Sequence, residues 1–174
     1  MGDRCTIHNN FLNVCEPIVI GNDVGLSVDV SLVTHGYWLS VLEGFPRKFA
    51  GITISDGVIL GYRSTVLMGV SIAEQCVVGA CSVVTSSLTQ PKCTYGGNPA
   101  KVINQLVGVK DKKGMLAGIA HKLGGRSNYP IVACDAFHAD VTTGDYWGKE
   151  SKKTDKFRDD LRKYGIRIYT ERPF

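Results

Sequence analysis

Four histidines are the side chains in this sequence best suited to moving a proton near neutral pH. They are His8, His35, His121 and His138. A neutral imidazole accepts a proton from a weakly acidic group such as a hydroxyl, so each is a candidate general base. His35 differs from the others because a regular repeat in the sequence stops at this residue and an aromatic segment follows it. His35 is therefore the first candidate for a catalytic role.

The cysteines offer neither a disulfide framework nor a metal site. Six cysteines occur, at positions 5, 15, 76, 81, 93 and 134, and no two form a Cys-x-x-Cys pair. A zinc site requires Cys and His clustered at short spacings, which the sequence does not contain. We expect free thiols, with Cys76 pointing into the core, and no bound metal.

A six-residue repeat provides the framework that would position His35. Every sixth residue from Ile54 is aliphatic: Ile54, Leu60, Val66, Ile72, Val78 and Val84. The position four residues further on is small or aliphatic: Val58, Ser64, Val70, Cys76, Ser82 and Leu88. A period of six fits neither a helix nor one long strand, but it fits a short strand followed by a turn. Stacked in register, such hexapeptides form one continuous core.

The repeat is interrupted once. Residues 18–35 keep the same phase and predict one more coil, after a short strand-like start at 7–17. Residues 36–51 have no period of six and are rich in aromatic side chains, so we expect a loop that leaves the coils. The abrupt start is compatible with a naturally short repeat or with a fragment that lacks upstream coils.

The last part of the chain has no repeat. We expect a turn at Gly96–Pro99, then a short strand or helix at 100–106 that closes the coils. Beyond it we predict a small α+β appendage over 107–174, with strands at 130–137 and 166–169 and a helix at 154–165. The segments 107–129 and 138–153 are predicted to be loops.

Composition favours a soluble chain of 174 residues with a real core. No run approaches 18 apolar residues and no signal pattern opens the sequence, so we expect a cytoplasmic protein without a membrane span. Residues 1–100 carry five Lys/Arg and seven Asp/Glu, whereas residues 101–174 carry fifteen and nine. The basic tail either faces a phosphate-bearing ligand or is a solvated surface, and no motif points to nucleic acid.

Together, the repeats, the interruption and the closing stretch GGNPAKVI (96–103) resemble the hexapeptide-repeat acetyltransferases. The resemblance is to their galactoside and maltose O-acetyltransferases and to the sugar acetyltransferases of polysaccharide biosynthesis, and it covers about residues 5–106. It implies a mainly β fold, a left-handed parallel β-helix over 1–106 with the excursion loop 36–51. It further implies a homotrimer with active sites between subunits.

The resemblance also implies the chemistry, which is acetyl transfer from acetyl-CoA to an acceptor. The catalytic histidine of that family precedes the loop, which corresponds to His35, and its asparagine corresponds to Asn10. The positions that match the family's coenzyme A-binding residues are Tyr62, Ala80, Thr85 and Lys101.

Tyr37 and Trp38 directly follow His35 in the sequence. Flat aromatic rings can stack on a sugar ring, so both are candidates for binding the acceptor, although packing within the loop would explain them equally well.

Several functions are compatible with these features. The first is an acetyl-CoA-dependent O-acetyltransferase that acts on a hydroxyl of a sugar or polysaccharide precursor. A related alternative is an N-acetyltransferase that acts on a nucleotide-linked amino sugar. A non-catalytic β-helix scaffold is a third, which the presence of His35 and the intact closing turn disfavour. A zinc carbonic anhydrase of the same fold would need three histidines near the coils, and only His35 lies there.

Overall fold

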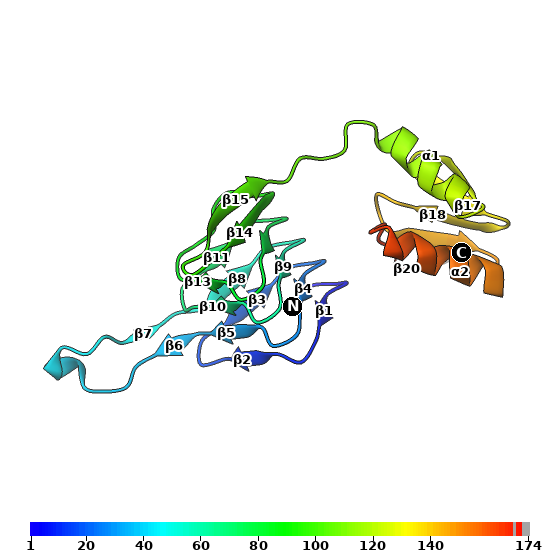
Figure 1. Cartoon of the computed structure of the whole chain (residues 1–174). Coiled ribbons are helices and arrows are strands. Elements are labelled where there is room, and N and C mark those ends of the chain that lie inside the picture. Colours follow the sequence, from blue (N-terminus) through cyan, green and yellow to red (C-terminus); the bar gives the residue numbers. More distant parts are fainter. Residues whose placement is uncertain (169, 172–174) are drawn as a thin grey trace. The chain divides into compact units, whose positions relative to one another are not determined.

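The computed structural model describes residues 1–168 and 170–171 and divides into two compact units, Met1–Val107 and Gly108–Phe174. The first unit consists of short strands wound into successive coils, and the second combines helices with a sheet (Figure 1). Among the described residues, no helix is long and apolar enough to span a membrane.

Three sheets form the coils of the first unit, and each of the first three coils contributes one strand to each of these sheets. The first sheet has the order β1 (Thr6–Ile7), β4 (Gly25–Leu26), β9 (Ile59–Leu60), β12 (Val77–Val78), β14 (Cys93–Gly96) and β15 (Lys101–Gln105). The second has the order β13 (Val83–Val84), β10 (Thr65–Val66), β5 (Ser31–Val33) and β2 (Phe11–Asn13). The third has the order β11 (Ser71–Ile72), β8 (Ile52–Ile54) and β3 (Ile18–Ile20). All pairings are parallel except that of β14 with β15, so the unit is a parallel β-helix.

The predicted aliphatic repeat forms the core of the coils. Its six residues from Ile54 to Val84 are each at most 1% exposed, and the secondary positions from Val58 to Leu88 are at most 4% exposed. Residues three hexapeptides apart are neighbours, as in Leu60↔Val78 and Val66↔Val84. Each coil therefore places its aliphatic side chains directly on those of the previous coil.

The corners between strands also repeat every six residues. Backbone φ is positive at Gly57, Arg63, Gly69, Gln75 and Cys81, each three residues before a buried aliphatic side chain. A left-handed residue turns the chain sharply, which lets two-residue strands follow each other around the core.

Close stacking of the coils explains one of the small residues next to the corners. A Cβ atom at Gly61 would lie 2.7 Å from the backbone nitrogen of Ala80 and 2.7 Å from the carbonyl oxygen of Val78. No side chain fits there without displacing the coil above.

The first coil begins earlier than the repeat suggests. Segment 7–17, predicted only as a strand-like start, contains the second residue of β1 and all of β2, and pairs with the second coil through Ile7↔Leu26 and Leu12↔Leu32. The aliphatic residues of this coil are not spaced by six, so the periodic pattern does not reveal it.

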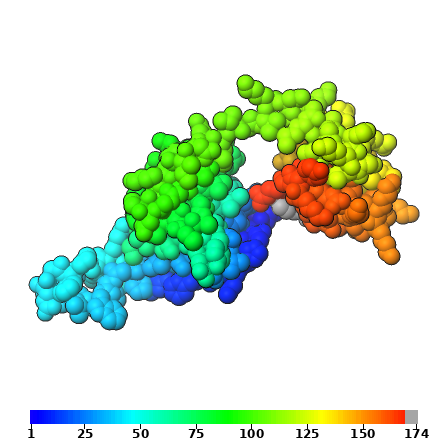
Figure 2. All heavy atoms as spheres, viewed as in Figure 1, coloured from blue at the N-terminus to red at the C-terminus, as the bar shows by residue number. Residues whose placement is uncertain are grey.

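The interruption at 36–51 forms an arm that leaves the coils (Figures 1 and 2). It is not simply a loop, because β6 (His35–Gly36) pairs with β7 (Lys48–Phe49) in antiparallel fashion at its base. A single 3₁₀ turn, η1 (Val41–Glu43), lies at its far end. The backbone nitrogen of Ala50 donates to the carbonyl oxygen of Thr34, which returns the chain to the coil it left.

The upper end of the coils is closed by β15, which folds back on β14 after the predicted turn at 96–99. The segment 100–106, expected to be a strand or a helix, is therefore mainly a strand.

The second unit has a five-stranded sheet in the order β16 (Arg126–Asn128), β17 (Ile131–Cys134), β18 (Phe137–Asp140), β19 (Asp145–Gly148) and β20 (Thr170–Glu171). Helices α1 (Lys112–Lys122) and α2 (Lys152–Lys163) share one core with it. That core comprises Leu116, Ile119, Val132, Cys134, Phe137, Ala139, Phe157, Leu161 and Ile168.

Several predictions for this unit were wrong in detail. The predicted loops 107–129 and 138–153 contain α1, β16, β19 and most of β18. The predicted strand 130–137 is divided between β17 and β18 by a turn at Asp135, whose φ is 52°. Of the strand expected at 166–169, residues 166–168 are not in a strand, and Tyr169 lies outside the described residues.

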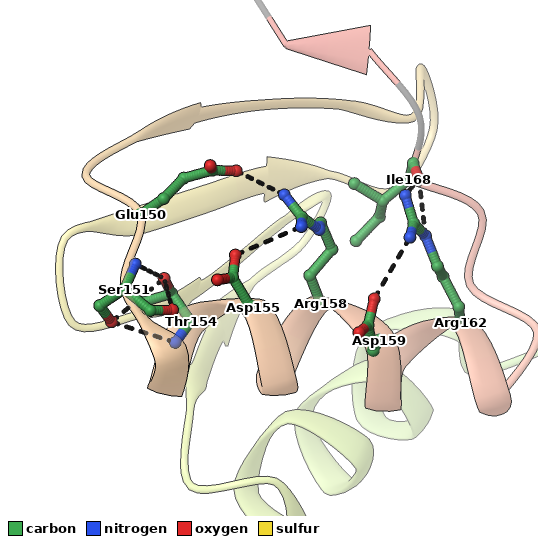
Figure 3. A network of polar contacts seen from close by, with 8 residues as sticks. All are labelled: Glu150, Ser151, Thr154, Asp155, Arg158, Asp159, Arg162 and Ile168. Carbon is green, nitrogen blue, oxygen red and sulfur yellow. Dashed lines mark hydrogen bonds and ion pairs between the residues drawn. The ribbon is translucent and has the colours of Figure 1, made fainter.

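Helix α2 begins two residues before the predicted start because Ser151 and Thr154 form a capping box (Figure 3). Along the helix, Arg158 pairs with Glu150 and Asp155. Arg162 donates to the carbonyl oxygen of Ile168 from both Nε and Nη2, at 3.1 and 2.8 Å. These contacts hold residues 166–168 against the helix, although these residues do not form a strand.

The stacked core predicts a sharp difference between neighbouring residues of β9. Leu60 is fully buried and Ile59 is 48% exposed. Leu60→Ala should lower the free energy of unfolding by about 2–5 kcal/mol, and Ile59→Ala by less than about 1 kcal/mol. Chemical denaturation of both variants measures this, and equal losses would contradict the assigned orientation of the strand.

Candidate active site

His35 is the first residue of β6 and meets an asparagine from the preceding coil. Its Nδ1 atom lies 2.7 Å from the side-chain oxygen of Asn13, the last residue of β2. Strands β2 and β5 pair with Asn13 opposite Val33, so the stacking of coils brings Asn13 beside the residues that follow β5. His35 is half-buried in this position.

Thr34 holds Asn13 in place. The Thr34 hydroxyl donates to the carbonyl oxygen of Asn13 at 2.7 Å and accepts from the backbone nitrogen of Glu16 at 3.1 Å. The backbone nitrogen of Thr34 donates to the side-chain oxygen of Asn13 at 3.4 Å. Because Thr34 is fully buried, these bonds do not compete with water.

This arrangement assigns the proton of the His35 ring. The Asn13 atom facing Nδ1 is an oxygen, since it also accepts from the backbone N–H of Thr34. An amide oxygen can only accept, so Nδ1 carries the hydrogen in the neutral imidazole. The lone pair of Nε2 is then free to take a proton from a substrate.

Aromatic rings of the arm line one side of His35. The ring of Phe49 stacks on the imidazole, with centroids 5.3 Å apart and an interplanar angle of 25°. Tyr37 is tilted against both rings, with centroids 6.2 Å from His35 and 5.6 Å from Phe49. The structure thus brings Tyr37 to His35, while Trp38 is 89% exposed and has no ring contact among the described residues.

Asn10, the asparagine selected from the sequence, makes other contacts. Its side-chain oxygen accepts from the backbone nitrogen of Val30 at 2.8 Å, and its side-chain nitrogen donates to the carbonyl oxygen of His8 at 3.2 Å. The residue that bonds His35 is Asn13, which sequence reasoning missed. Aligning Leu12 with Leu32 as neighbours in stacked coils would have revealed it.

The residues predicted to bind coenzyme A lie higher along the coils. Tyr62 and Ala80 occupy equivalent corners of adjacent coils, because the backbone nitrogen of Cys81 donates to the carbonyl oxygen of Tyr62 at 2.8 Å. Thr85 directly follows β13, and Lys101 begins β15. All four side chains are exposed, so each is accessible to a ligand.

An open hollow lies along another edge of the coils. It is lined by residues of the third sheet's strands and of the turns that follow them, including Val19, Thr53, Asp56 and Glu74. It contains none of the predicted site residues.

The cysteines in the described parts of the chain are free thiols. No group of three or more His, Cys, Asp or Glu there could hold a metal ion. Burial raises the pKa of the Cys76 and Cys134 thiols, which keeps these sulfur atoms protonated and poorly nucleophilic.

Known proteins resemble the chain in sequence. No family model matches it. Over 102 residues it is 37% identical to a Schizosaccharomyces pombe protein named a putative acetyltransferase. The matched region covers 55% of this chain and 46% of that protein. The chain spans about half the length of the curated relatives it matches.

Solved structures share the fold. The hexapeptide-repeat-containing acetyltransferase VCA0836 of Vibrio cholerae is 28% identical, with a TM-score of 0.56 over 62% of each chain. A maltose O-acetyltransferase of Clostridium difficile is also 28% identical, with a TM-score of 0.54 over 62% of this chain and 58% of that one. The resemblance to hexapeptide-repeat acetyltransferases, predicted from the sequence, is therefore confirmed.

The role of the Thr34 hydroxyl can be tested by measuring the unfolding free energy of variants at this position. Thr34→Val removes the hydroxyl and leaves the Glu16 nitrogen and the Asn13 carbonyl without this partner, which should cost about 1–3 kcal/mol of unfolding free energy. Thr34→Ser keeps the hydroxyl and should cost less than Thr34→Val. A valine variant as stable as the parent in urea denaturation would show that the buried bonds do not stabilise this corner.

Proposed function

We propose that the chain is an acetyl-CoA-dependent O-acetyltransferase that acts on a sugar hydroxyl, with His35 as its general base. The observation that carries this proposal is the Asn13–His35 hydrogen bond, which leaves Nε2 free at the base of the arm. The similarity to acetyltransferases of the same fold, one of them named for maltose, supports the reaction type.

In the proposed reaction, Nε2 of His35 takes the proton of the acceptor hydroxyl as its oxygen attacks the acetyl carbon of the thioester. The carbon–oxygen bond forms, the carbon–sulfur bond breaks, and the coenzyme A thiolate leaves with the proton from the imidazolium. Asn13 stabilises the imidazolium and keeps the ring oriented. Asn10 has no bond to the base and is proposed to contact the acceptor.

Tyr37 and Trp38 are proposed to contact the acceptor, because both are exposed on the arm that begins at His35. Tyr62, Ala80, Thr85 and Lys101 are proposed to bind acetyl-CoA. We further propose a left-handed helix and a homotrimer with sites between subunits, as in the family that the sequence resembles.

The second candidate, transfer to the amine of a nucleotide-linked amino sugar, uses the same base and donor. It is distinguished by the product, because an amide resists mild alkaline hydroxylamine and an ester does not.

The test is release of coenzyme A thiol from acetyl-CoA in the presence of a panel of neutral, acidic and amino sugars. His35→Ala should lower kcat by roughly 10²–10⁴-fold, because the proton acceptor is lost while the core remains intact. His121→Ala, an exposed change on α1, is the matched control and should keep full activity. A His35→Ala protein that acetylates its acceptor at the parent rate would rule out this mechanism.

A further inference from the structure

Two basic residues of the arm lie next to the candidate base. In the β6–β7 pair, His35 is opposite Phe49 and Gly36 is opposite Lys48. The guanidinium carbon of Arg47 lies 5.9 Å from the centroid of the Phe49 ring, and that ring stacks on His35. The Arg47 guanidinium and the imidazole of His35 therefore contact the same aromatic ring.

Lys48 extends along the same edge of the coils as His35. A Cβ atom built on Gly69 would lie 2.9 Å from the Lys48 ammonium nitrogen, so this ammonium rests on the corner that follows β10. Strand β10 pairs directly with β5, whose end leads into His35. The positive charge of Lys48 is thus held one coil above the base.

Neither cation is neutralised within the described part of the chain. No ion pair there includes Arg47 or Lys48, although other basic side chains of the protein form several. The one acidic residue of the arm, Glu43, lies in η1 at its far end. Two uncompensated positive charges beside a catalytic base attract an anion and repel a cation.

We propose that the acceptor is an anionic sugar, whose carboxylate or phosphate group is bound by Arg47 and Lys48 while a hydroxyl faces Nε2 of His35. This proposal rests on the proposed function and narrows its substrate class. Arginine binds either group through two parallel hydrogen bonds, and lysine adds a point charge. The phosphates of coenzyme A are the other source of such an anion, so the experiment below measures binding of coenzyme A as well as of the sugars.

Ligand binding tests the proposal without requiring turnover. Saturation-transfer NMR measures dissociation constants of methyl β-D-glucuronide, glucose 6-phosphate and the neutral methyl β-D-glucoside, each with the full chain and coenzyme A present. The parent protein should bind at least one of the anionic sugars about tenfold more tightly than the glucoside, as expected for hydrogen bonds to charged groups. The preference should weaken as salt is added.

Three variants separate charge from folding. Arg47→Gln with Lys48→Gln should abolish the preference, whereas Arg47→Lys with Lys48→Arg should retain most of it. Lys113→Gln, an exposed change on α1, removes one charge elsewhere and should leave the preference unchanged. Circular dichroism of each variant checks that the fold is kept.

The outcomes are distinct. Equal binding of charged and neutral sugars by the parent, or a preference that survives the double glutamine change, would overturn the proposal. Weaker binding of coenzyme A with an unchanged sugar preference would assign the two cations to the donor and also overturn it. Failure of the thiol-release assay alone would refute the transferase function, while the binding preference would remain measurable.

Discussion

The stacking of aliphatic side chains at six-residue intervals determines the geometry of the whole first unit. Leu60 rests on Val78 and Val66 on Val84, and the parallel hydrogen bonds between their strands fix this register. A shift of one residue would turn the buried side chains outward. Because the register cannot slip, residues far apart in the sequence, such as Asn13 and His35, meet in a defined orientation.

The arm turns this rigid stack into a candidate active site. The chain leaves the second coil after Thr34, and Ala50 returns to the same residue through a backbone hydrogen bond. The coil is therefore completed as if nothing had been inserted. The base lies at the junction, with one side held by the coil through Asn13 and the other against Phe49 of the arm. The coil therefore orients the base through a hydrogen bond, and the arm adds an aromatic contact to it.

The sequence predicted the core well because a strict period has a single structural meaning. It did not predict the contact to His35, since Leu12 and its neighbours in the first coil lack the six-residue spacing that would reveal their register. Helix α1 was missed because Lys, Gly and Ala dominate it and only Leu116, Ile119 and Ala120 are buried. The hairpin at Asp135 was read as one strand, because its apolar residues continue through the turn.

The most direct measurement of the central claim is the protonation of the two His35 ring nitrogens. Nitrogen-15 NMR of ring-labelled protein, assigned by comparison with His35→Ala, reports which nitrogen carries the hydrogen when the imidazole is neutral. The account predicts a hydrogen on Nδ1, bound to Asn13, and a bare Nε2, with a mixture of both forms in Asn13→Ala. A neutral His35 protonated at Nε2 in the parent protein would contradict its assignment as the general base.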